Sequence, residues 1–595
     1  MLRIWTYLLV ASTLMAQVPQ SPGGDPYYRA KLFTPTPTAL QALLDQAGYD
    51  TDCMPVGPDF VEVVLSPQEY GVLQQVGFQP VVLETAAPLS AILGDIPVGY
   101  HDLTAIRNIL LAKQAALPAL CKVHNLSTAY GPSLTVEGRA IEAIKISANV
   151  LVDEDEPNIL IATSHHAREI STPEEALDLI ERLTAGYGVD PSITALLNTH
   201  EIWIVPVVNP DGVNTVWTTN NLWRKNRRNN GDGTFGVDLN RNYPHLWSTV
   251  CGGSTITSSE TYRGPSAGSE VETQTMVNFS RSRRFAKVLD FHSYGRDVLL
   301  SYVCSPIPTA LGSAIDSAGI SLAASVGFGT RDPSAEGEHQ IFQIGEITSY
   351  AYLIEMNLSF QPAYSVALSE AIILWPLVQS FFNKPMSIRG HVTDALSGLP
   401  IAANLTVNTV AWTQGETRKS RALNGAYDMF LPAGSHMITA SAPGYQNLVA
   451  PVTVSATSTA TLNLALQPLN TTFTLALSTN GGGFGNLNLA LNNVPAGTVQ
   501  GYTVFSFDTA APVGTGALIG ISPDALSYNC IAQPLALGSI FHWSWPASGV
   551  YPQVPIVFPG GSFPFPAGLQ ADGVAAAISA SPSLLGTTQV VRITF

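Results

Sequence analysis

A histidine and a glutamate three residues apart follow a short apolar run and are suited to bind a metal ion. Ile159 to Thr163 has the length and composition of a buried strand, and the segment Ser164-His-His-Ala-Arg-Glu169 follows it directly. Functional sites in open α/β sheets lie at the carboxyl ends of strands, where this segment begins. Residues at i and i+3 can face the same side of a tight turn, so His166 and Glu169 can bind one ion together. Zn²⁺ accepts an imidazole and a carboxylate, and it needs a third protein ligand from elsewhere.

This pair alone is a weak signal, but an ordered set of polar motifs downstream strengthens it. The motifs are Asn209-Pro-Asp-Gly212, Leu222-Trp-Arg-Lys-Asn-Arg227, Val237-Asp-Leu-Asn-Arg-Asn242, Glu260-Thr-Tyr-Arg-Gly264, Ser269-Glu270, Asp290-Phe-His-Ser-Tyr294 and Tyr352-Leu-Ile-Glu355. Together they supply a further histidine, several guanidinium groups and carboxylates.

The ordered set resembles the zinc carboxypeptidases of the carboxypeptidase A type. The resemblance covers roughly residues 98–383, and Thr135-Val-Glu-Gly-Arg-Ala-Ile141 resembles an early strand pair of that family. It implies that His166, Glu169 and His292 bind one Zn²⁺ per catalytic domain. Two histidines and one glutamate are the ligand set of carboxypeptidase A. It also implies that Asp238 orients a ligand imidazole.

The same resemblance implies roles in catalysis and substrate binding. Glu355 would be the general base that takes a proton from the attacking water and passes it to the leaving amine. Arg224 would polarise the scissile carbonyl and stabilise the charge that develops on its oxygen. Asn240 and Arg241 would hold the terminal carboxylate of the substrate, with Arg168 assisting nearby. Such a contact would make the protein an exopeptidase.

One departure from the family concerns the cover of the substrate pocket. Family members usually carry a mobile tyrosine some twenty residues before the general base, whereas this chain has Gly329-Thr-Arg-Asp-Pro-Ser334 there. Arg331 and Tyr302 are candidates to replace it, and Tyr294 is a candidate to line the pocket. The segment Glu336-Gly-Glu-His-Gln-Ile-Phe342 should line the specificity pocket, and its mixed side chains indicate neither a basic nor an apolar preference.

The elements that must position these residues alternate between strands and helices over residues 97–383. Besides Ile159 to Thr163, the runs Ile202 to Val208 and Ala286 to Phe291 are predicted strands, and Ser171 to Thr184 is a predicted amphipathic helix. Such alternation predicts an α/β fold with a mixed, largely parallel sheet and helices on both faces.

A small α+β domain is predicted before the catalytic domain, over residues 17–96. It contains strands at Tyr28 to Phe33, Phe60 to Leu65 and Phe78 to Leu83, and helices at Thr38 to Ala47 and from Ser66, which should be an N-cap. This unit resembles the propeptide of the family and should cap the site. Residues 1–16 read as a signal peptide, with an early arginine, an apolar stretch and a small residue before cleavage.

Two β-rich segments follow the catalytic domain. Residues 386–468 show short alternating strands and resemble the transthyretin-like sandwich that some family members carry. Residues 471–595 are again β-rich and resemble no family, so they are a C-terminal domain of unknown role.

Composition limits the partners. The formal net charge is −16, which disfavours nucleic acid and anionic membranes because both attract basic surfaces. No apolar stretch long enough to span a membrane follows the N-terminus, and we expect a secreted monomer, extracellular or periplasmic. The five cysteines lack CxxC spacing and do not resemble a metal cluster or a disulfide framework, although Cys251 and Cys304 could pair in an oxidising compartment.

Three functions are compatible with these features. The leading hypothesis is hydrolysis of C-terminal residues from peptides and proteins. The second keeps the zinc chemistry but directs it at the peptides of bacterial cell walls, because the usual tyrosine is missing. The third is an inactive binding or adhesion protein, which the low charge and the long β-rich tail favour and the intact ligand set disfavours.

Overall fold

The described part of the chain forms two compact units. The structure is a computed structural model that describes residues 28–46, 49–51, 56–85 and 96–595, apart from short gaps at 250, 303, 334, 396, 413, 415, 417, 469–472, 480–485, 547–548, 563–564 and 582. The first unit comprises the residues up to Ala442 together with Asn447–Leu466, and the second comprises Pro443–Gln446 and Gln467–Phe595. The predicted signal peptide at 1–16 lies outside the described residues.

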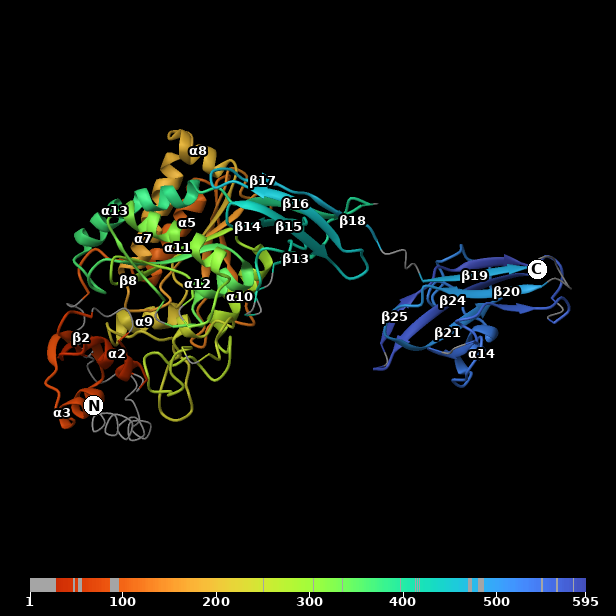
Figure 1. Cartoon of the computed structure of the whole chain (residues 1–595), viewed down its shortest axis with the longest axis horizontal. Coiled ribbons are helices and arrows are strands. Elements are labelled where there is room, and N and C mark those ends of the chain that lie inside the picture. Colours follow the sequence, from red (N-terminus) through yellow and green to blue (C-terminus); the bar gives the residue numbers. More distant parts are fainter. Residues whose placement is uncertain are drawn as a thin grey trace. The chain divides into compact units, whose positions relative to one another are not determined.

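An eight-stranded sheet lies at the centre of the first unit (Figure 1). Its strand order is β10-β9-β11-β8-β6-β7-β5-β4. The strands are β4 (Cys121–Asn125), β5 (Glu142–Ile146), β6 (Asn158–Thr163), β7 (Glu201–Val205), β8 (Lys287–Ser293), β9 (Asp297–Leu299), β10 (Gly329–Arg331) and β11 (Tyr350–Met356). The central strands β11, β8, β6 and β7 are parallel, whereas β9 joins β11 and β5 joins β7 in antiparallel fashion. The predicted mixed sheet is therefore confirmed.

Helices cover this sheet on both faces. They are α5 (Leu103–Ala116), α6 (Leu126–Ala129), α7 (Ser171–Gly186), α8 (Pro191–Leu197), α9 (Pro210–Thr218), α10 (Val271–Arg283), α11 (Thr309–Ala324), α12 (His339–Phe342) and α13 (Tyr364–Asn383), with the short helical turns η1 (Leu239–Arg241) and η2 (Gln343–Ile347). Every residue of β6, β7, β8 and β11 is buried. Because successive side chains of a strand point to opposite faces, complete burial requires cover on both sides.

Strand ends differ from the predicted ones in two informative places. The strand predicted at Ile202 to Val208 ends at Val205, because the next residue, Pro206, has no N–H for the sheet. The strand predicted at Ala286 to Phe291 instead runs on to Ser293, so that His292 is held inside a rigid strand.

The N-terminal part is a three-stranded sheet with two helices, as predicted. Its elements are β1 (Tyr28–Phe33), α2 (Pro37–Gln46), β2 (Phe60–Leu65), α3 (Pro67–Gln75) and β3 (Val81–Thr85), in the sheet order β2-β1-β3. Ser66 caps α3 in a capping box, in which Glu69 N donates to Ser66 Oγ and Ser66 N donates to Glu69 Oε2. The third strand begins later than predicted, after Pro80, which cannot donate to a sheet.

The remaining residues of the first unit form two small sheets. The strands are β12 (Ile388–Asp394), β13 (Asn404–Val407), β14 (Ala426–Met429), β15 (Gly434–Ser441), β16 (Leu448–Val454), β17 (Ala460–Thr461) and β18 (Leu464–Leu466). One sheet contains β14-β12-β17 with β18 paired to β12, and the other contains β13-β15-β16. Two small sheets of short strands are consistent with the predicted sandwich.

The second unit is also built from β-sheets. Its elements are β19 (Thr474–Thr479), β20 (Leu487–Asn492), β21 (Thr498–Ser506), α14 (Ala525–Ala532), β22 (His542–Ser544), β23 (Ile556–Phe558), β24 (Gln570–Ser579), β25 (Leu584–Thr587) and β26 (Val591–Thr594). Trp543, Tyr551 and Ala575 belong to a buried cluster in it. This unit therefore has a core of its own.

Contrary to the expectation from the sequence, one stretch after the N-terminus, helix α13, is long and apolar enough to cross a membrane by length and composition alone. Its inner side belongs to the protein core, where Leu374, Leu377 and Phe381 are buried. The same side carries Glu370, which forms an ion pair with Arg296. We therefore interpret α13 as a core helix of the first unit.

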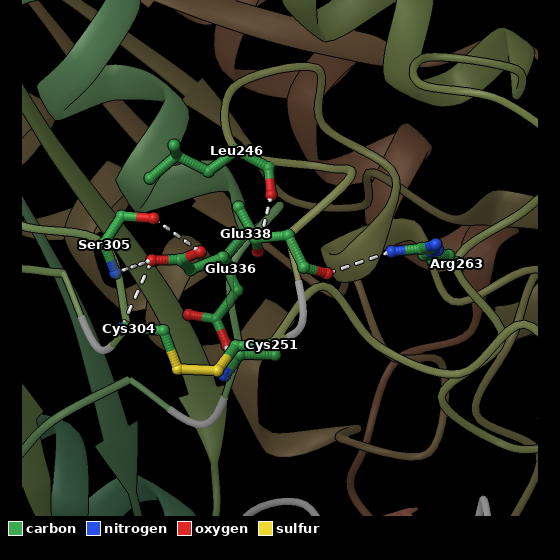
Figure 2. Close-up of a disulfide and its surroundings, with 9 residues drawn as sticks. Leu246, Cys251, Arg263, Cys304, Ser305, Glu336 and Glu338 are labelled. Carbon is green, nitrogen blue, oxygen red and sulfur yellow. Dashed lines mark hydrogen bonds between the residues drawn. A yellow bond between two sulfur atoms is a disulfide. The ribbon is translucent and has the colours of Figure 1, made fainter. Parts of the chain in front are cut away.

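A disulfide joins two loops beside the carboxyl ends of the central strands (Figure 2). Cys251 and Cys304 are paired, with their Cα atoms 6.3 Å apart. Glu336 ties the same two loops together, because its N–H donates to Cys251 O at 2.9 Å and its carboxylate accepts from the N–H groups of Cys304 and Ser305. The segment that follows Glu336 is thereby fixed in place.

Helix α7 contains an unusual buried carboxyl group. Glu175 is 1% exposed, and among the described residues neither of its side-chain oxygens has a hydrogen-bond partner. Burial raises the pKa of Glu175 well above its usual value, and Asp178 adds to the increase. Its neighbour Glu174, by contrast, accepts hydrogen bonds from the backbone and ring of His101.

Replacing Glu175 by an apolar residue should stabilise the protein. Glu175→Met should raise the free energy of unfolding at pH 7 by about 1–3 kcal/mol, because an unpaired buried polar group is costly. A carboxyl with a raised folded pKa destabilises the fold above its unfolded pKa of about 4.3, so the gain should shrink toward pH 4. Urea unfolding from pH 4 to 8 measures this. Glu174→Met should instead destabilise, and a gain for Glu175→Met that does not vary with pH would contradict the assignment.

Candidate metal centre

Three electron-pair donors meet at the carboxyl end of the central sheet. His166 Nδ1 lies 2.8 Å from Glu169 Oε1, and His292 Nδ1 lies 3.1 Å from His166 Nδ1 and 3.2 Å from Glu169 Oε2. All three side chains are at most 1% exposed. The three donor atoms point at one another in a place that water does not reach. A cation bound by all three side chains would remove the repulsion between their lone pairs.

The local backbone explains how residues three apart in sequence come together. Strand β6 ends at Thr163, and Ser164 takes a positive φ of 57°, which turns the chain sharply out of the sheet. Ala167 N then donates to Arg224 O, and Glu169 N donates to His166 O at 3.3 Å. Helix α7 begins only at Ser171, so the two ligands lie in a tight turn between the strand and the helix.

Asp238 fixes the orientation of His166. Its Oδ1 lies 3.1 Å from His166 Nε2, and its Oδ2 accepts from Arg224 Nη2 at 2.7 Å and from Arg224 Nε at 3.1 Å. Burial would raise the pKa of Asp238, but Arg224 and His166 outweigh it and hold that pKa well below the usual value. A carboxylate can only accept, so His166 carries its proton on Nε2 and leaves the lone pair of Nδ1 for a metal.

Electrostatics also keep the carboxylate ligand charged. Burial opposes ionisation of Glu169, yet His166 and His292 lower the pKa of Glu169 to about 2. Ser293 N donates to Glu169 Oε2 at 3.2 Å and fixes the carboxylate further. Two imidazoles, which are neutral when they bind a metal, and one carboxylate form a donor set that suits Zn²⁺.

A second buried cluster surrounds Asp290, two residues before His292 on the same face of β8. Asp290 Oδ1 lies 3.1 Å from His165 Nδ1, and Asp290 Oδ2 lies 3.0 Å from His339 Nδ1 and 3.4 Å from His292 Nε2. His165 Nε2 lies 2.8 Å from Tyr243 Oη. One carboxylate thus serves three imidazoles, and His165 and His339 orient the ligand strand rather than complete the zinc site.

Glu355 lies directly beside the third ligand. Strands β11 and β8 are parallel and pair Glu355 with His292, which places the two side chains on the same face of the sheet. Glu355 is fully buried, and its Oε1 accepts from Arg331 Nη2 at 3.2 Å. Tyr302, the other candidate for the missing tyrosine, is buried and contacts His245 at 3.0 Å.

The residues expected to bind substrate all lie close to this centre, and each has a partner within the chain. Asn240 Oδ1 accepts from His339 N at 2.8 Å, and Arg241 Nη1 donates to Glu338 Oε1 at 3.1 Å. The partners of Arg168 and Tyr294 come instead from the N-terminal part of the chain, as described below. Asp290 and Glu338 lie within segments that the sequence analysis quoted, but it assigned neither residue a partner; the structure pairs them with His165, His339 and Arg241.

Comparison with known proteins agrees with this geometry. Residues 108–357 match the family model for zinc carboxypeptidase, and residues 387–467 match the model for the carboxypeptidase regulatory-like domain. Carboxypeptidase A2 of Rattus norvegicus is 36% identical over 208 residues, which are 34% of this chain and 46% of that protein. A zinc carboxypeptidase of Saccharothrix mutabilis subsp. capreolus is 37% identical over 156 residues, 26% of this chain and 34% of that protein.

A solved structure shows the same fold. The crystal structure of carboxypeptidase A from Helicoverpa armigera matches with a TM-score of 0.50 and 20% sequence identity, over 61% of this chain and 97% of that chain. At this identity the likeness concerns the fold alone. The chain spans about half the length, or less, of the curated relatives it matches.

The matched family model, the fold and the convergent ligands define a zinc-binding α/β domain in which His166, Glu169 and His292 form the metal site. Residues 108–357 are thus similar to the zinc carboxypeptidases, among them carboxypeptidase A2, and residues 387–467 are similar to the carboxypeptidase regulatory-like domain.

Loss of the Asp238 carboxylate should weaken zinc binding. Asp238→Asn removes an acceptor that fixes His166, so zinc affinity should fall about 10- to 100-fold. Competition with a chromogenic chelator measures this affinity. Asp178→Asn is a matched control, because Asp178 also pairs with an arginine, Arg182, but contacts no ligand. Equal affinities for the two variants would contradict a role for Asp238 at the metal.

Proposed function

We propose that this protein is a zinc metallocarboxypeptidase that hydrolyses the C-terminal peptide bond of peptides and proteins. The observation that carries the proposal is the placement of Glu355 in register with the ligand His292, beside three converging zinc ligands. The similarity to carboxypeptidase A2 supports the same class of substrate. Zinc bound by His166, Glu169 and His292 would lower the pKa of a water molecule to about 7 and polarise the scissile carbonyl.

The protein's own residues supply the remaining chemistry. Glu355 takes the proton of the attacking water and delivers it to the leaving amine. Arg224 pairs with Asp238, which in turn contacts the zinc ligand His166. Its guanidinium stabilises the negative charge that develops on the carbonyl oxygen, an effect worth about 3 kcal/mol. Asn240 and Arg241 hold the terminal carboxylate of the substrate.

We also propose an oxidising compartment, extracellular or periplasmic, as the place of action. The disulfide between Cys251 and Cys304 supports this, because disulfides persist mainly outside the cytosol. The signal peptide predicted at residues 1–16 would direct the protein to such a compartment, and we expect it to act there as a monomer.

Removal of the carboxylate of Glu355 should abolish hydrolysis. Glu355→Gln should lower kcat about 10²- to 10⁴-fold, the usual contribution of a general base. Release of C-terminal amino acids from a peptide panel measures this, and a chelator should abolish the wild-type activity until zinc is added back. Glu346→Gln is the matched control, since Glu346 pairs with Arg281 at the protein surface. Activity that survives the chelator, or a kcat of Glu355→Gln close to the wild-type value, would refute the proposed function.

The N-terminal part is proposed to cap the site as a propeptide. Arg168 Nη1 lies 2.6 Å from Asp50 Oδ2, with both side chains fully buried. Tyr294 Oη donates to Glu62 Oε2 at 2.8 Å and accepts from Arg29 Nη1 at 3.0 Å. Two residues expected to bind substrate are thus occupied by residues of the cap.

Apolar packing joins the cap to the same place. Val64 of β2 belongs to one buried cluster with Leu222, Tyr294 and Phe360. The guanidinium of Arg168 also lies 4.2 Å from the centroid of the Phe360 ring. The cap therefore covers apolar surface that a substrate side chain would otherwise contact.

Weakening the cap should activate the full-length protein. Asp50→Asn leaves Arg168 without its buried carboxylate, and breaking such a pair from one side costs about 3–5 kcal/mol. The full chain should therefore hydrolyse peptides faster, and proteolysis near residues 88–97 should raise wild-type activity to a similar level. Asp59→Asn, at an exposed position of the same domain, should change neither rate. Equal activity of intact and cleaved wild-type protein would contradict the cap.

A further inference from the structure

An arginine at the edge of the central sheet contacts the residue proposed as general base. Glu355 is fully buried in β11, and its Oε1 accepts from Arg331 Nη2 at 3.2 Å. Arg331 is the last residue of β10, and 30% of its side chain is exposed. In the strand order β10-β9-β11-β8, Arg331 and the zinc ligand His292 belong to strands on opposite sides of β11. The carboxylate of Glu355 is therefore held from the side of the sheet that carries no zinc ligand.

Backbone pairing fixes the strand that carries Arg331. Strand β10 pairs with β9 in parallel, with Arg331 opposite Leu299, and Leu300 N donates to Arg331 O at 2.9 Å. Strand β9 pairs in turn with β11 in antiparallel fashion. Arg331 thus belongs to the same sheet as Glu355. A residue held in a strand is suited to fix a neighbour in place, and it is unsuited to swing over a substrate.

A second carboxylate contacts the same guanidinium. Arg331 Nε lies 3.9 Å from Asp297 Oδ2. Asp297 is opposite Glu355 in the antiparallel pairing, so the two side chains project from the same face of the sheet. Burial raises the pKa of Asp297, and Arg331 opposes that increase. Two neighbouring carboxylates repel each other, and a guanidinium within reach of both offsets the repulsion.

Two glycines leave room for these carboxylates. A Cβ on Gly329 would lie 2.2 Å from Asp297 Oδ1. A Cβ on Gly295 would lie 3.3 Å from Glu355 Cβ and 3.2 Å from Asp297 Oδ2. A larger residue at either position would push against one of the two side chains that Arg331 contacts. The local sequence is therefore compatible with the three charged groups in this arrangement.

We propose that Arg331 is a positioning residue for the reaction, which holds the carboxylate of Glu355 in place and is itself held by Asp297. This rests on the proposed function, because the orientation of Glu355 matters only if that residue is the general base. A general base works only within hydrogen-bond reach of the proton that it takes, so a carboxylate that turns away lowers the rate and leaves substrate affinity unchanged. Arg331 acts through Glu355 and does not cover the substrate.

The first test measures kcat and KM separately for peptide hydrolysis by the zinc-loaded protein, with and without the cap. Arg331→Met should lower kcat about 10- to 100-fold, which is part of the 10²- to 10⁴-fold contribution of a general base. KM should change less than about twofold. Arg331→Lys keeps the charge and should lose less than Arg331→Met. Equal losses in the two variants, or a rise in KM with unchanged kcat, would overturn the proposal.

Two further variants test the arrangement around Arg331. Asp297→Asn should lower kcat only about two- to fivefold, because a partly exposed ion pair contributes little. Arg281→Met is the matched control, since Arg281 also pairs with a glutamate distant in sequence, Glu346, but at the protein surface. It should change neither kcat nor KM. A loss of kcat in Arg281→Met as large as that in Arg331→Met would overturn the proposal.

A double variant shows whether Arg331 acts through Glu355. In the Glu355→Gln background, Arg331→Met should lower kcat by less than about twofold further, because residues that act in one step are not additive. A further loss as large as that in the wild-type background would overturn the proposal. Arg331 would then affect the reaction at another place.

Crystal structures distinguish failure of this inference from failure of the proposed function, because they require no turnover. In the zinc-loaded wild type, Arg331 should lie within hydrogen-bond distance of Glu355. In zinc-loaded Arg331→Met, the carboxylate of Glu355 should turn away from its wild-type position. A wild-type structure without this contact would overturn the proposal, whether or not any variant folds. An unmoved carboxylate in Arg331→Met would overturn it even if the protein hydrolysed no peptide.

Discussion

The convergence of His166, Glu169 and His292 is the constraint on which the rest of the catalytic domain depends. Three electron-rich atoms within about 3 Å of one another in a buried place repel unless a cation joins them. The two parallel strands β6 and β8 end side by side, so the turn after one and the last residues of the other supply all three donors. The stability of this part of the domain and its affinity for zinc are therefore linked.

Two further carboxylates, Asp238 and Asp290, hold the histidines and one arginine around the zinc ligands in position. Asp238 fixes His166 and Arg224 at once, and Asp290 bridges His165 and His339 beneath His292. The arginines proposed to face a substrate, Arg224 and Arg241, each pair with a carboxylate of the same domain. Preorganisation of this kind reduces the reorganisation needed when charge develops during the reaction.

The same pairing rule also explains how the site can be regulated and tuned. Where the carboxylate comes from the N-terminal part, as Asp50 does, removal of the proposed cap would expose a guanidinium. Where it comes from the same domain as the arginine, as Glu338 does, it stays beside the guanidinium. The position of the partner in the chain, rather than the distance between the two groups, decides which consequence follows.

The amino-acid sequence by itself determined the local elements and the identity of the zinc ligands. Strands Tyr28–Phe33 and Phe60–Leu65 and the cap at Ser66 follow from composition and hydrogen-bonding capacity within a few residues, which act whatever the rest of the chain does. The pairing of Asp290 with His292 could also have been predicted, because residues two apart on a strand share a face. The tertiary structure alone decided that Arg241 meets Glu338 and that Arg168 meets Asp50. These partners lie far apart in the chain, and no short-range pattern encodes which distant charges a fold will bury together.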